Sequence, residues 1–487
     1  MKRNVLCLLA GIGIVAGGCT MAPKYKRPTA PISAAWPTGA AYPEVQTTTG
    51  IPKACDLGWM EFFTDAKLQK AIETALTNNR DLRLAALNVE LARALYGIQR
   101  AELLPAVNAV GSGIRQRVPG DLSLTGKPAI SEQYGVNLGV ASWEIDFFGR
   151  IRSLKDRALQ QYLATEQARR SAQILLISGV ANVYLALAAD QENLALAQTT
   201  LTSQRDAYDL IKRRHDLGLV SDLDLYRAQT QVDTARGDAA RFRQRAAQSK
   251  NALDLLLGVP TPDELLPMNL DGVAPPTEVA PGMPSEVLLR RPDVLQAEGL
   301  LRAAYANIGA ARAALFPRIS LTASAGSASS ELSGLFDAGS GVWSYAPQIV
   351  MPIFDARTWS ALKASKVQQQ IILTQYEKAI QTAFREVADT LAVRGTVDQQ
   401  VSAQQSLVDA VAETYRLSKS RYDKDIDSYL GVLDAQRSLY AAQQGLVYLR
   451  LAKIANSVQL YAVLGGGWQT EHSSAIAPVS RQKPSDK

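Results

Sequence analysis

Polar and apolar positions follow two different periods along this chain, and the changes between them mark the predicted elements. From Arg318 to Ala325 polar and apolar residues alternate, and a period of two indicates a β-strand with one polar and one apolar face. Over much longer stretches without proline, apolar residues recur at helical spacing. The chain is therefore expected to combine a few strands with long helices.

A helical stretch opens each half of the chain and ends at a proline. The first is predicted over about residues 68–103, before Pro105, and the second over about residues 286–315, before Pro317. Proline lacks a backbone N–H and disfavours the helical conformation in the residue before it. The backbone is expected to become extended at both prolines.

A β-hairpin is predicted after each proline, over residues 103–145 and 317–353. Polar, glycine-rich loops at residues 118–131 and 329–341 separate the two extended segments of each hairpin. Each segment has about 10–13 residues, the length with which a tilted strand crosses a bilayer. Each chain is thus expected to supply four transmembrane β-strands.

Two long helices are predicted after the hairpins, over about residues 149–217 and 358–424. At 1.5 Å per residue each would extend on the order of 100 Å, and a bilayer core is only about 30 Å thick. These helices are therefore expected to project out of the membrane.

Each long helix is expected to reverse at a turn, near Gly218 and near Asp425, and to return through residues 222–257 and 428–464. Apolar residues and tyrosines repeat every seven positions in the long helices, a spacing typical of helices packed side by side in a coiled coil. These positions are Leu187, Leu194, Leu201 and Tyr208 in the first helix and Val401, Val408 and Tyr415 in the second.

The two halves are predicted to be copies of one unit, because landmark residues recur in the same order. At one common offset, Asp81, Gly97 and Pro105 recur as Asp293, Gly309 and Pro317. At a second, slightly smaller offset, Val180, Arg214, Ser221 and Gly258 recur as Val387, Arg421, Ser428 and Gly465.

The predicted organisation is a signal peptide (1–18), a lipid-anchored N-terminal arm (19–64), a first repeat (65–259, with long helices over 149–257), a Pro-rich linker (260–284), a second repeat (285–465, with long helices over 358–464) and a flexible tail (466–487).

The N-terminus indicates export. Lys2 and Arg3 precede an apolar run that ends in small residues at Cys19, which predicts a secretory signal peptide and a cysteine placed to take a covalent lipid such as palmitate. The alternative is an ordinary signal peptide with an incidental cysteine. No later stretch is expected to provide 18 uncharged apolar residues, so no transmembrane helix is expected and a membrane crossing would require strands.

Composition narrows the class of protein. A hydrophobic content of 47% with 20% charged residues excludes a disordered chain. The net charge of +6 is spread along the chain without a basic run interleaved with aromatic residues, so nucleic acid is not an expected partner. Cys7 leaves with the signal and Cys19 would carry the lipid, so Cys55 has no cysteine with which to form an internal disulfide.

The chain shows no catalytic constellation. Its two histidines are His215 and His472, and a lone histidine at a helix tip is typically a surface residue. We find no zinc-binding cysteine cluster, phosphate-binding loop or nucleophile elbow. No enzyme activity, no metal site and no cofactor other than the lipid on Cys19 are expected.

Four strands cannot close a barrel within one chain. The smallest membrane barrels have about 8 strands, and an open sheet edge in lipid leaves backbone groups unsatisfied at a cost of several kcal/mol each. Two chains would form a barrel filled by its own side chains, whereas three chains would supply about 12 strands and leave an aqueous lumen. The alternative, a periplasmic coiled-coil scaffold lipoprotein that is not a channel, leaves the bilayer length of both hairpins unexplained.

Short segments distributed along the chain carry a family resemblance. They are residues 19–28 (CTMAPKYKRP), 117–123 (RVPGDLS), 146–150 (DFFGR), 188–192 (AADQE) and 433–437 (LDAQR). Through their order and spacing, nearly the whole mature chain resembles the outer-membrane factors of tripartite efflux pumps, in the lipoprotein, OprM/NodT-like branch of the TolC superfamily.

The resemblance implies a mixed α/β membrane protein, a homotrimer with a β-barrel of about 12 strands and a periplasmic α-helical coiled-coil barrel of about 12 helices. It implies a passive exit duct in the outer membrane, anchored by lipid. The implied partners are a periplasmic adaptor (membrane fusion) protein and an inner-membrane transporter, commonly a proton-driven multidrug pump.

In this family the two helix-turn-helix ends narrow the periplasmic tip. By its place before Ser428, Asp427 matches the family's aperture aspartate, and a trimer would contain a ring of three such carboxylates that favours cations. Arg421 and Arg214 are candidate latch partners, and the alternative for all these residues is that they are solvated turn charges. The candidate aperture residues are Asp427, Asp425, Asp423, Arg421, Tyr422 and Arg214.

Asp425 stands where family members usually have glycine, so this turn departs from the pattern. The loop that contains Asp121 would face outward and restrict the outer mouth, or be an ordinary surface loop. Trp59, Phe62 and Phe63 are expected to pack the N-terminal arm in place.

The expected cargo is antibiotics and other small molecules. Ducts of the same fold for metal ions or for secreted proteins are alternatives. Six methionines and two histidines give metal export little support, and protein-secretion channels of this superfamily usually lack the lipid cysteine.

Overall fold

The structure, a computed structural model, describes residues 20–42, 51–123, 126–280, 288–424 and 426–467. Cys19, Asp425, the end of the linker at 281–284 and the tail from residue 468 lie outside the described residues. The chain divides into two compact units. The first comprises Met1–Thr29, Asn88–Glu166 and Gln296–Glu377, and the second comprises Ala30–Leu87, Gln167–Leu295 and Lys378–Lys487.

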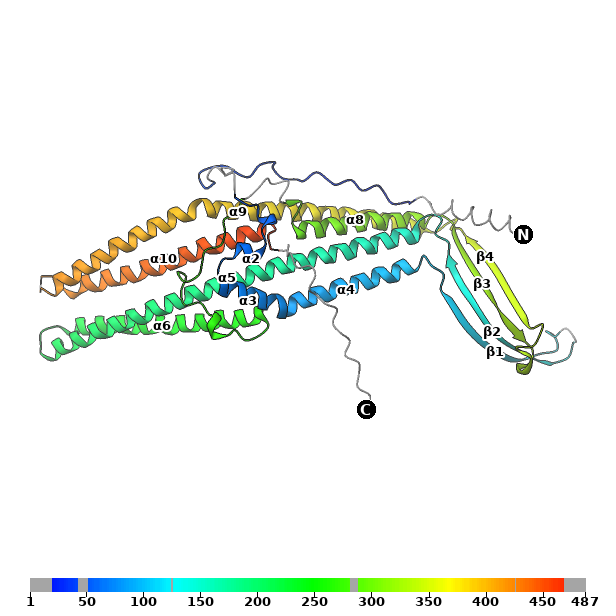
Figure 1. Ribbon diagram of the computed structural model, residues 1–487, viewed down its shortest axis with the longest axis horizontal. Helices are drawn as coiled ribbons and strands as arrows, with labels where there is room; N and C mark the ends of the chain where they lie inside the picture. The colour runs from blue at the N-terminus through cyan, green and yellow to red at the C-terminus, as the bar shows by residue number, and fades with distance from the viewer. Residues whose placement is uncertain (1–19, 43–50, 124–125, 281–287, 425, 468–487) are drawn as a thin grey trace. The chain divides into compact units, whose positions relative to one another are not determined.

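The first unit contains a four-stranded antiparallel sheet in which the strands follow the order of the chain (Figure 1). Its strands are β1 (Val107–Val118), β2 (Ala129–Glu144), β3 (Arg318–Ser329) and β4 (Gly341–Val350). Both expected hairpins are present, and the pairing of β2 with β3 joins them into one sheet.

The register of the sheet separates an apolar face from a polar face. Ile319 on β3 lies opposite Ile349 on β4. On the other face Ser324 lies opposite Ser344, and their hydroxyls are hydrogen bonded at 2.8 Å. The alternation predicted from Arg318 to Ala325 is therefore a strand with two chemically different faces.

The element order of helix, hairpin, long helix and returning helix occurs twice along the chain (Figure 1). The helices are α2 (Trp59–Phe62), α3 (Ala66–Asn78), α4 (Arg80–Ala101), α5 (Arg150–Asp216), α6 (Asp222–Leu257), α8 (Pro292–Ala313), α9 (Ala356–Tyr422) and α10 (Tyr429–Val463), with short 3-10 turns η1 (Ala54–Asp56), η2 (Asp263–Leu265) and η3 (Leu332–Gly334).

The single helix predicted over residues 68–103 is wrong, because the chain forms two helices separated at Asn79. Asn79 adopts an extended conformation, and its Oδ1 accepts a hydrogen bond of 2.9 Å from the backbone N–H of Leu82. Its Nδ2 donates to the carbonyl oxygen of Leu256 at 2.9 Å. The side chain thus caps α4 and binds the end of α6, which makes a break at this residue favourable.

The corresponding helix of the second half, α8, begins at Pro292, and the predicted start at residue 286 lies outside the described residues. Proline is favoured at the first position of a helix, where its missing N–H would have no intrahelical partner. The turn before it is held by Arg291, which donates to the carbonyl oxygen of Val463 at 2.8 Å and pairs with Glu386 at 2.8 Å.

The aromatic residues that precede α3 lie in the core of the second unit. Trp59, Phe62 and Phe63 are all buried. The ring of Phe62 stacks on that of Tyr461 with centroids 3.9 Å apart, and the Tyr461 hydroxyl donates to the carbonyl oxygen of Leu57 at 2.7 Å. The expected packing role of these aromatic residues is confirmed.

The expectation that no later stretch would be long and apolar enough to span a bilayer is wrong for α5. Among the residues that the structure describes, this helix contains an 18-residue window with a mean hydropathy of 1.8. However, 67% of the window is buried, because Ile177, Val180 and Tyr184 lie in the core of the second unit. Its apolar character therefore reflects packing within the protein.

Candidate functional site

The second tip turn, between α9 and α10, is closed by an ion pair between Arg421 and Asp427. The guanidinium binds both carboxylate oxygens, with Nη2 and Oδ1 3.2 Å apart, and about half of each side chain is exposed. The backbone N–H of Ile426 also donates to the carbonyl oxygen of Arg421 at 2.9 Å. The pair therefore joins the last turn of α9 to the residue before the N-cap of α10.

This pair shifts the titration of both groups. The hydrogen bond from Arg421 holds the pKa of the Asp427 carboxyl below its usual range. The same hydrogen bond raises the pKa of the Arg421 guanidinium. At neutral pH the carboxylate is thus charged but locally compensated, which differs from the free carboxylate on which the prediction of a cation-favouring ring was based.

Arg214 and Tyr422 connect the two tip turns. Nη1 of Arg214, near the end of α5, donates to the hydroxyl of Tyr422, the last residue of α9, at 3.0 Å. The guanidinium carbon also lies 5.6 Å from the centroid of the Tyr422 ring. This ring is 5.0 Å from that of Tyr429, the first residue of α10. The predicted latch residue Arg214 therefore reaches a tyrosine of the other helix-turn-helix end.

The first tip turn contains a contact that sequence reasoning missed. Gly218 adopts a positive φ of 71°, and Ser221 caps α6 by accepting from the N–H of Asp224. Across this turn Nε2 of His215 lies 2.6 Å from Oδ1 of Asp222, and Nδ1 lies 3.6 Å from Asp216. The sequence signal for this contact is a histidine seven residues before an aspartate with a glycine turn between them, and His215 is paired where a lone histidine is expected.

The remaining candidates are placed more simply. Asp423 lines a shallow hollow of about 360 Å³ at the end of α9, together with Tyr415 and Lys419. Asp121 is exposed in the turn that follows β1. Asp425 and Cys19 lie outside the described residues, so their predicted roles remain predictions.

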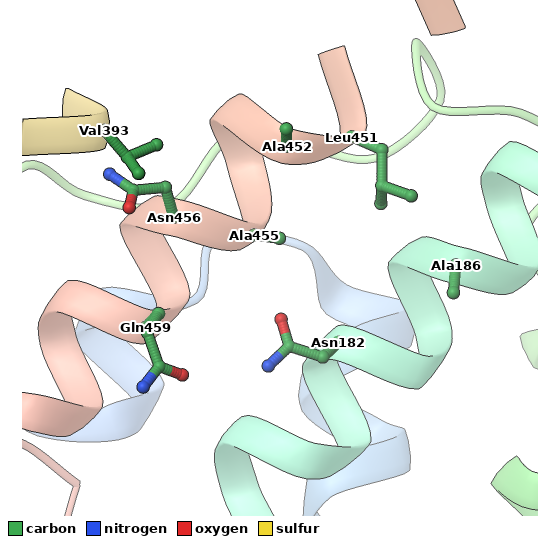
Figure 2. Close-up of a pocket in the computed structure, with 8 residues that line it drawn as sticks. All are labelled: Asn182, Ala186, Val393, Leu451, Ala452, Ala455, Asn456 and Gln459. Atoms are coloured by element: carbon green, nitrogen blue, oxygen red, sulfur yellow. The ribbon is translucent and has the colours of Figure 1, made fainter. Parts of the chain in front are cut away.

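A second hollow, of about 410 Å³, lies between α5 and α10 in the second unit (Figure 2). The carboxamides of Asn182 and Gln459 point into it, and small side chains such as Ala455 form its wall. Oδ1 of Asn182 is buried without a hydrogen-bond partner in the described part of the chain. Its lining combines three carboxamides with alanine, valine and leucine side chains, and it carries no charged group among the described residues.

The sheet presents large apolar side chains on one face. Trp343, Tyr345 and Ile349 are between 64% and 81% exposed in the single chain. A face of this kind is typical of a sheet that contacts lipid. The apolar face is made up of Val107, Ala109, Val136, Leu138, Val140, Ile319, Leu321, Ala323, Trp343, Tyr345 and Ile349.

Comparison with known proteins agrees with these features. The family model described as outer membrane efflux protein matches residues 71–259 and 283–466. Two proteins of Pseudomonas putida, the antibiotic efflux pump outer membrane protein ArpC and the toluene efflux pump outer membrane protein TtgC, are each 48% identical over 99% of this chain and their full length. The open-state crystal structure of the MtrE outer membrane channel of Neisseria gonorrhoeae matches with a TM-score of 0.83, at 38% identity over 93% of this chain and 99% of that chain.

The chain therefore belongs to the outer membrane efflux protein family. It has the fold of the TolC-like outer membrane channels, and it is an outer-membrane component of an efflux pump.

Proposed function

We propose that three copies of this chain form a lipid-anchored duct in the outer membrane, through which an efflux pump expels small molecules. The observation that carries the proposal is a sheet with one apolar and one polar face, of a length that crosses a bilayer, whose outer edges are left open within one chain. The proposal includes a covalent lipid on Cys19 and no enzymatic step.

The open edges favour closure by further copies. In the described part of the chain the outer edges of β1 and β4 have no strand partner, and every residue of β4 is exposed. Unsatisfied edge groups are unstable in lipid, and a closed barrel removes them. Three copies would supply about 12 strands, enough for a water-filled lumen lined by the polar face.

An apolar seam on α4 supports the same assembly. None of the 22 residues of this helix is buried. Four of its leucines and one isoleucine recur at spacings of three or four residues, as along a coiled-coil seam, and each of these five side chains is more than half exposed. A neighbouring copy is the proposed partner of this seam, because a free apolar stripe would otherwise face water. The seam residues are Leu84, Leu87, Leu91, Leu95 and Ile98.

The proposed aperture is the pair of tip turns. Three copies would bring together three Arg421–Asp427 pairs and three Arg214–Tyr422 contacts. Opening of the pore would break the contacts between the turns and expose the carboxylates to the cargo. Asp423, Asp425 and, at the outer mouth, Asp121 are proposed as secondary determinants.

The proposed cargo is antibiotics and small apolar molecules, since the two Pseudomonas putida relatives carry the names of an antibiotic and a toluene efflux pump. The chain would act with a periplasmic adaptor and with an inner-membrane transporter, of the proton-driven multidrug type, that supplies the energy.

Conductance in planar bilayers tests the proposal. The purified full-length protein should insert in discrete steps of equal conductance. If intact, folded protein binds the membrane but never conducts, the proposed duct is contradicted. A periplasmic coiled-coil scaffold lipoprotein then becomes the better interpretation.

A further inference from the structure

The first part of the N-terminal arm, from Thr20 to Thr29, is held against α8 of the same unit through one carboxylate. The side chain of Glu298 on α8 is only 4% exposed, and a buried carboxylate is destabilising unless its charge is compensated. The arm supplies two of its partners. The Tyr25 hydroxyl donates to Oε1 at 3.0 Å, and Arg27 forms a bidentate pair with distances of 3.2 and 2.7 Å.

Residues of α8 complete this site. Arg302 donates to Oε1 of Glu298 at 2.7 Å, and its guanidinium carbon lies 4.9 Å from the centroid of the Tyr25 ring. The ring of Tyr305 meets that of Tyr25 edge to face at 5.5 Å. Burial raises the pKa of Tyr25 to about 12, so its hydroxyl stays protonated and remains a donor.

The start of the arm contacts the other end of α8. Nη1 of Arg312 donates to the carbonyl oxygen of Met21 at 3.3 Å. A β-carbon at Gly309 would lie 2.8 Å from the α-carbon of Ala22 and 2.7 Å from Oγ of Ser153. Only glycine at this position lets the arm approach the helix so closely.

The spacing of these contacts matches a nearly extended arm. Between Arg312 and Glu298, α8 rises about 21 Å at 1.5 Å per residue. The arm from Met21 to Arg27 can span at most about 20–22 Å when fully extended. The arm therefore runs extended and antiparallel to α8, and its start lies at the end of the helix that leads into β3.

We infer that Glu298 is a positioning residue that holds the arm in register along α8 and thereby fixes Thr20 beside the entry to β3. The consequence rests on the proposed lipidation, because Cys19 is covalently joined to Thr20. The Glu298 contacts would then determine the position along α8 from which the lipid enters the membrane.

Limited proteolysis of the full-length protein tests this register. Lys24 and Lys26 are exposed, so trypsin can cleave after them once the arm lifts from α8. We expect Glu298→Gln and Arg27→Gln to speed cleavage by about tenfold or more. Arg27→Gln leaves the buried Glu298 carboxylate with fewer partners, and Glu298→Gln removes the charge that holds Arg27. Tyr25→Phe, which removes one hydroxyl from the arm and leaves α8 unchanged, should have a smaller effect in the same direction. Glu331→Gln, a matched change of charge in the loop after β3, should leave the rate unchanged.

The mobility of a spin label at Lys24→Cys, in a Cys55→Ser background, is a second readout. As long as the protein stays folded, a general loss of stability leaves this mobility unchanged. The spectrum of the label should become mobile in Arg27→Gln and stay immobile in Glu331→Gln. Unchanged cleavage and an immobile label in both clasp variants, Glu298→Gln and Arg27→Gln, would overturn the inference. Incorporation of labelled palmitate is measured in parallel, since its absence in the wild-type protein contradicts the proposed anchor while the cleavage rates still decide the register.

Discussion

Arg214 donates a hydrogen bond of 3.0 Å to the hydroxyl of Tyr422, and this contact joins the end of α5 to the end of α9. This side-chain contact links two tip turns that are each closed by a local pair, His215 with Asp222 in the first and Arg421 with Asp427 in the second. In the proposed duct, opening of the tip requires the two turns to separate. The Arg214–Tyr422 contact is therefore the one whose loss should open the pore most selectively.

Tyr422→Phe removes only the acceptor of this hydrogen bond and keeps the aromatic ring. Loss of the bond should disfavour the closed state by about 0.5–1.5 kcal/mol, and the variant should show a larger open fraction in single-channel recordings. Tyr415→Phe, on the same helix, is the matched control. Equal open fractions in wild type and Tyr422→Phe would show that the contact does not restrain the tip.

Asp427→Ala should raise single-channel conductance and increase leakage of large antibiotics in whole cells. The change removes the carboxylate proposed to narrow the pore and releases Arg421 from the turn. Arg421→Gln should have a different signature, since it leaves three uncompensated carboxylates and should increase selectivity for cations. An Asp427→Ala channel indistinguishable from wild type would remove this residue from the aperture.

The first tip turn should loosen as pH rises. Hydrogen bonding to Asp222, with a further contribution from Asp216, raises the pKa of His215. Since the folded-state pKa is raised above the unfolded value of about 6.5, the contact stabilises the turn fully below that pH and is lost as pH rises through the raised folded-state pKa. Hydrogen exchange of amides 217–221 should accelerate across this window.

His215→Gln serves as the control for this pH dependence. In this variant amides 217–221 should exchange, at every pH, at the fast rate that the wild type reaches at high pH, after correction for intrinsic exchange. A wild-type turn whose protection does not change between pH 6 and the alkaline side of the transition would contradict the assignment.

Two glycines with the same backbone conformation should respond differently to alanine. Gly218 has a φ of 71° and no atom within 4 Å of an added β-carbon, whereas Gly258 has a φ of 72° and the carbonyl oxygen of Asn78 at 2.5 Å. Gly218→Ala should therefore cost only the left-handed strain of about 1–2 kcal/mol. Gly258→Ala should cost clearly more, because the end of α6 must move away from α3. Thermal unfolding of the two variants compares them directly. Equal losses of stability would show that the close approach of Gly258 to Asn78 is not maintained.

The periodic parts of this fold could be predicted from sequence because they depend on local patterns. Alternation from Arg318 identified β3, and the absence of proline identified α5 and α9. The break at Asn79 carried a local signal, since asparagine followed by charged residues is a good N-cap, but the continuing apolar pattern outweighed it. Interpreting Asn79 as an N-cap predicts the break between the two helices.

The pairing of the aperture residues could not be predicted in this way. Arg214 and Tyr422 lie far apart in sequence, and their contact depends on how two helix-turn-helix ends pack. Glu298 gave no sequence signal either, because the two arm residues that compensate it lie 273 and 271 residues earlier in the chain. Motifs located the charged turns, and only the tertiary structure decided which charges compensate each other.

The number of chains in the purified protein tests the central claim most directly, because the open sheet edges and the α4 seam both require neighbouring copies. Native mass spectrometry of the detergent-solubilised protein should give a single species of three chains, and replacing Leu91 and Leu95 by Asn should dissociate it. A folded species of one chain in mild detergent would contradict the account.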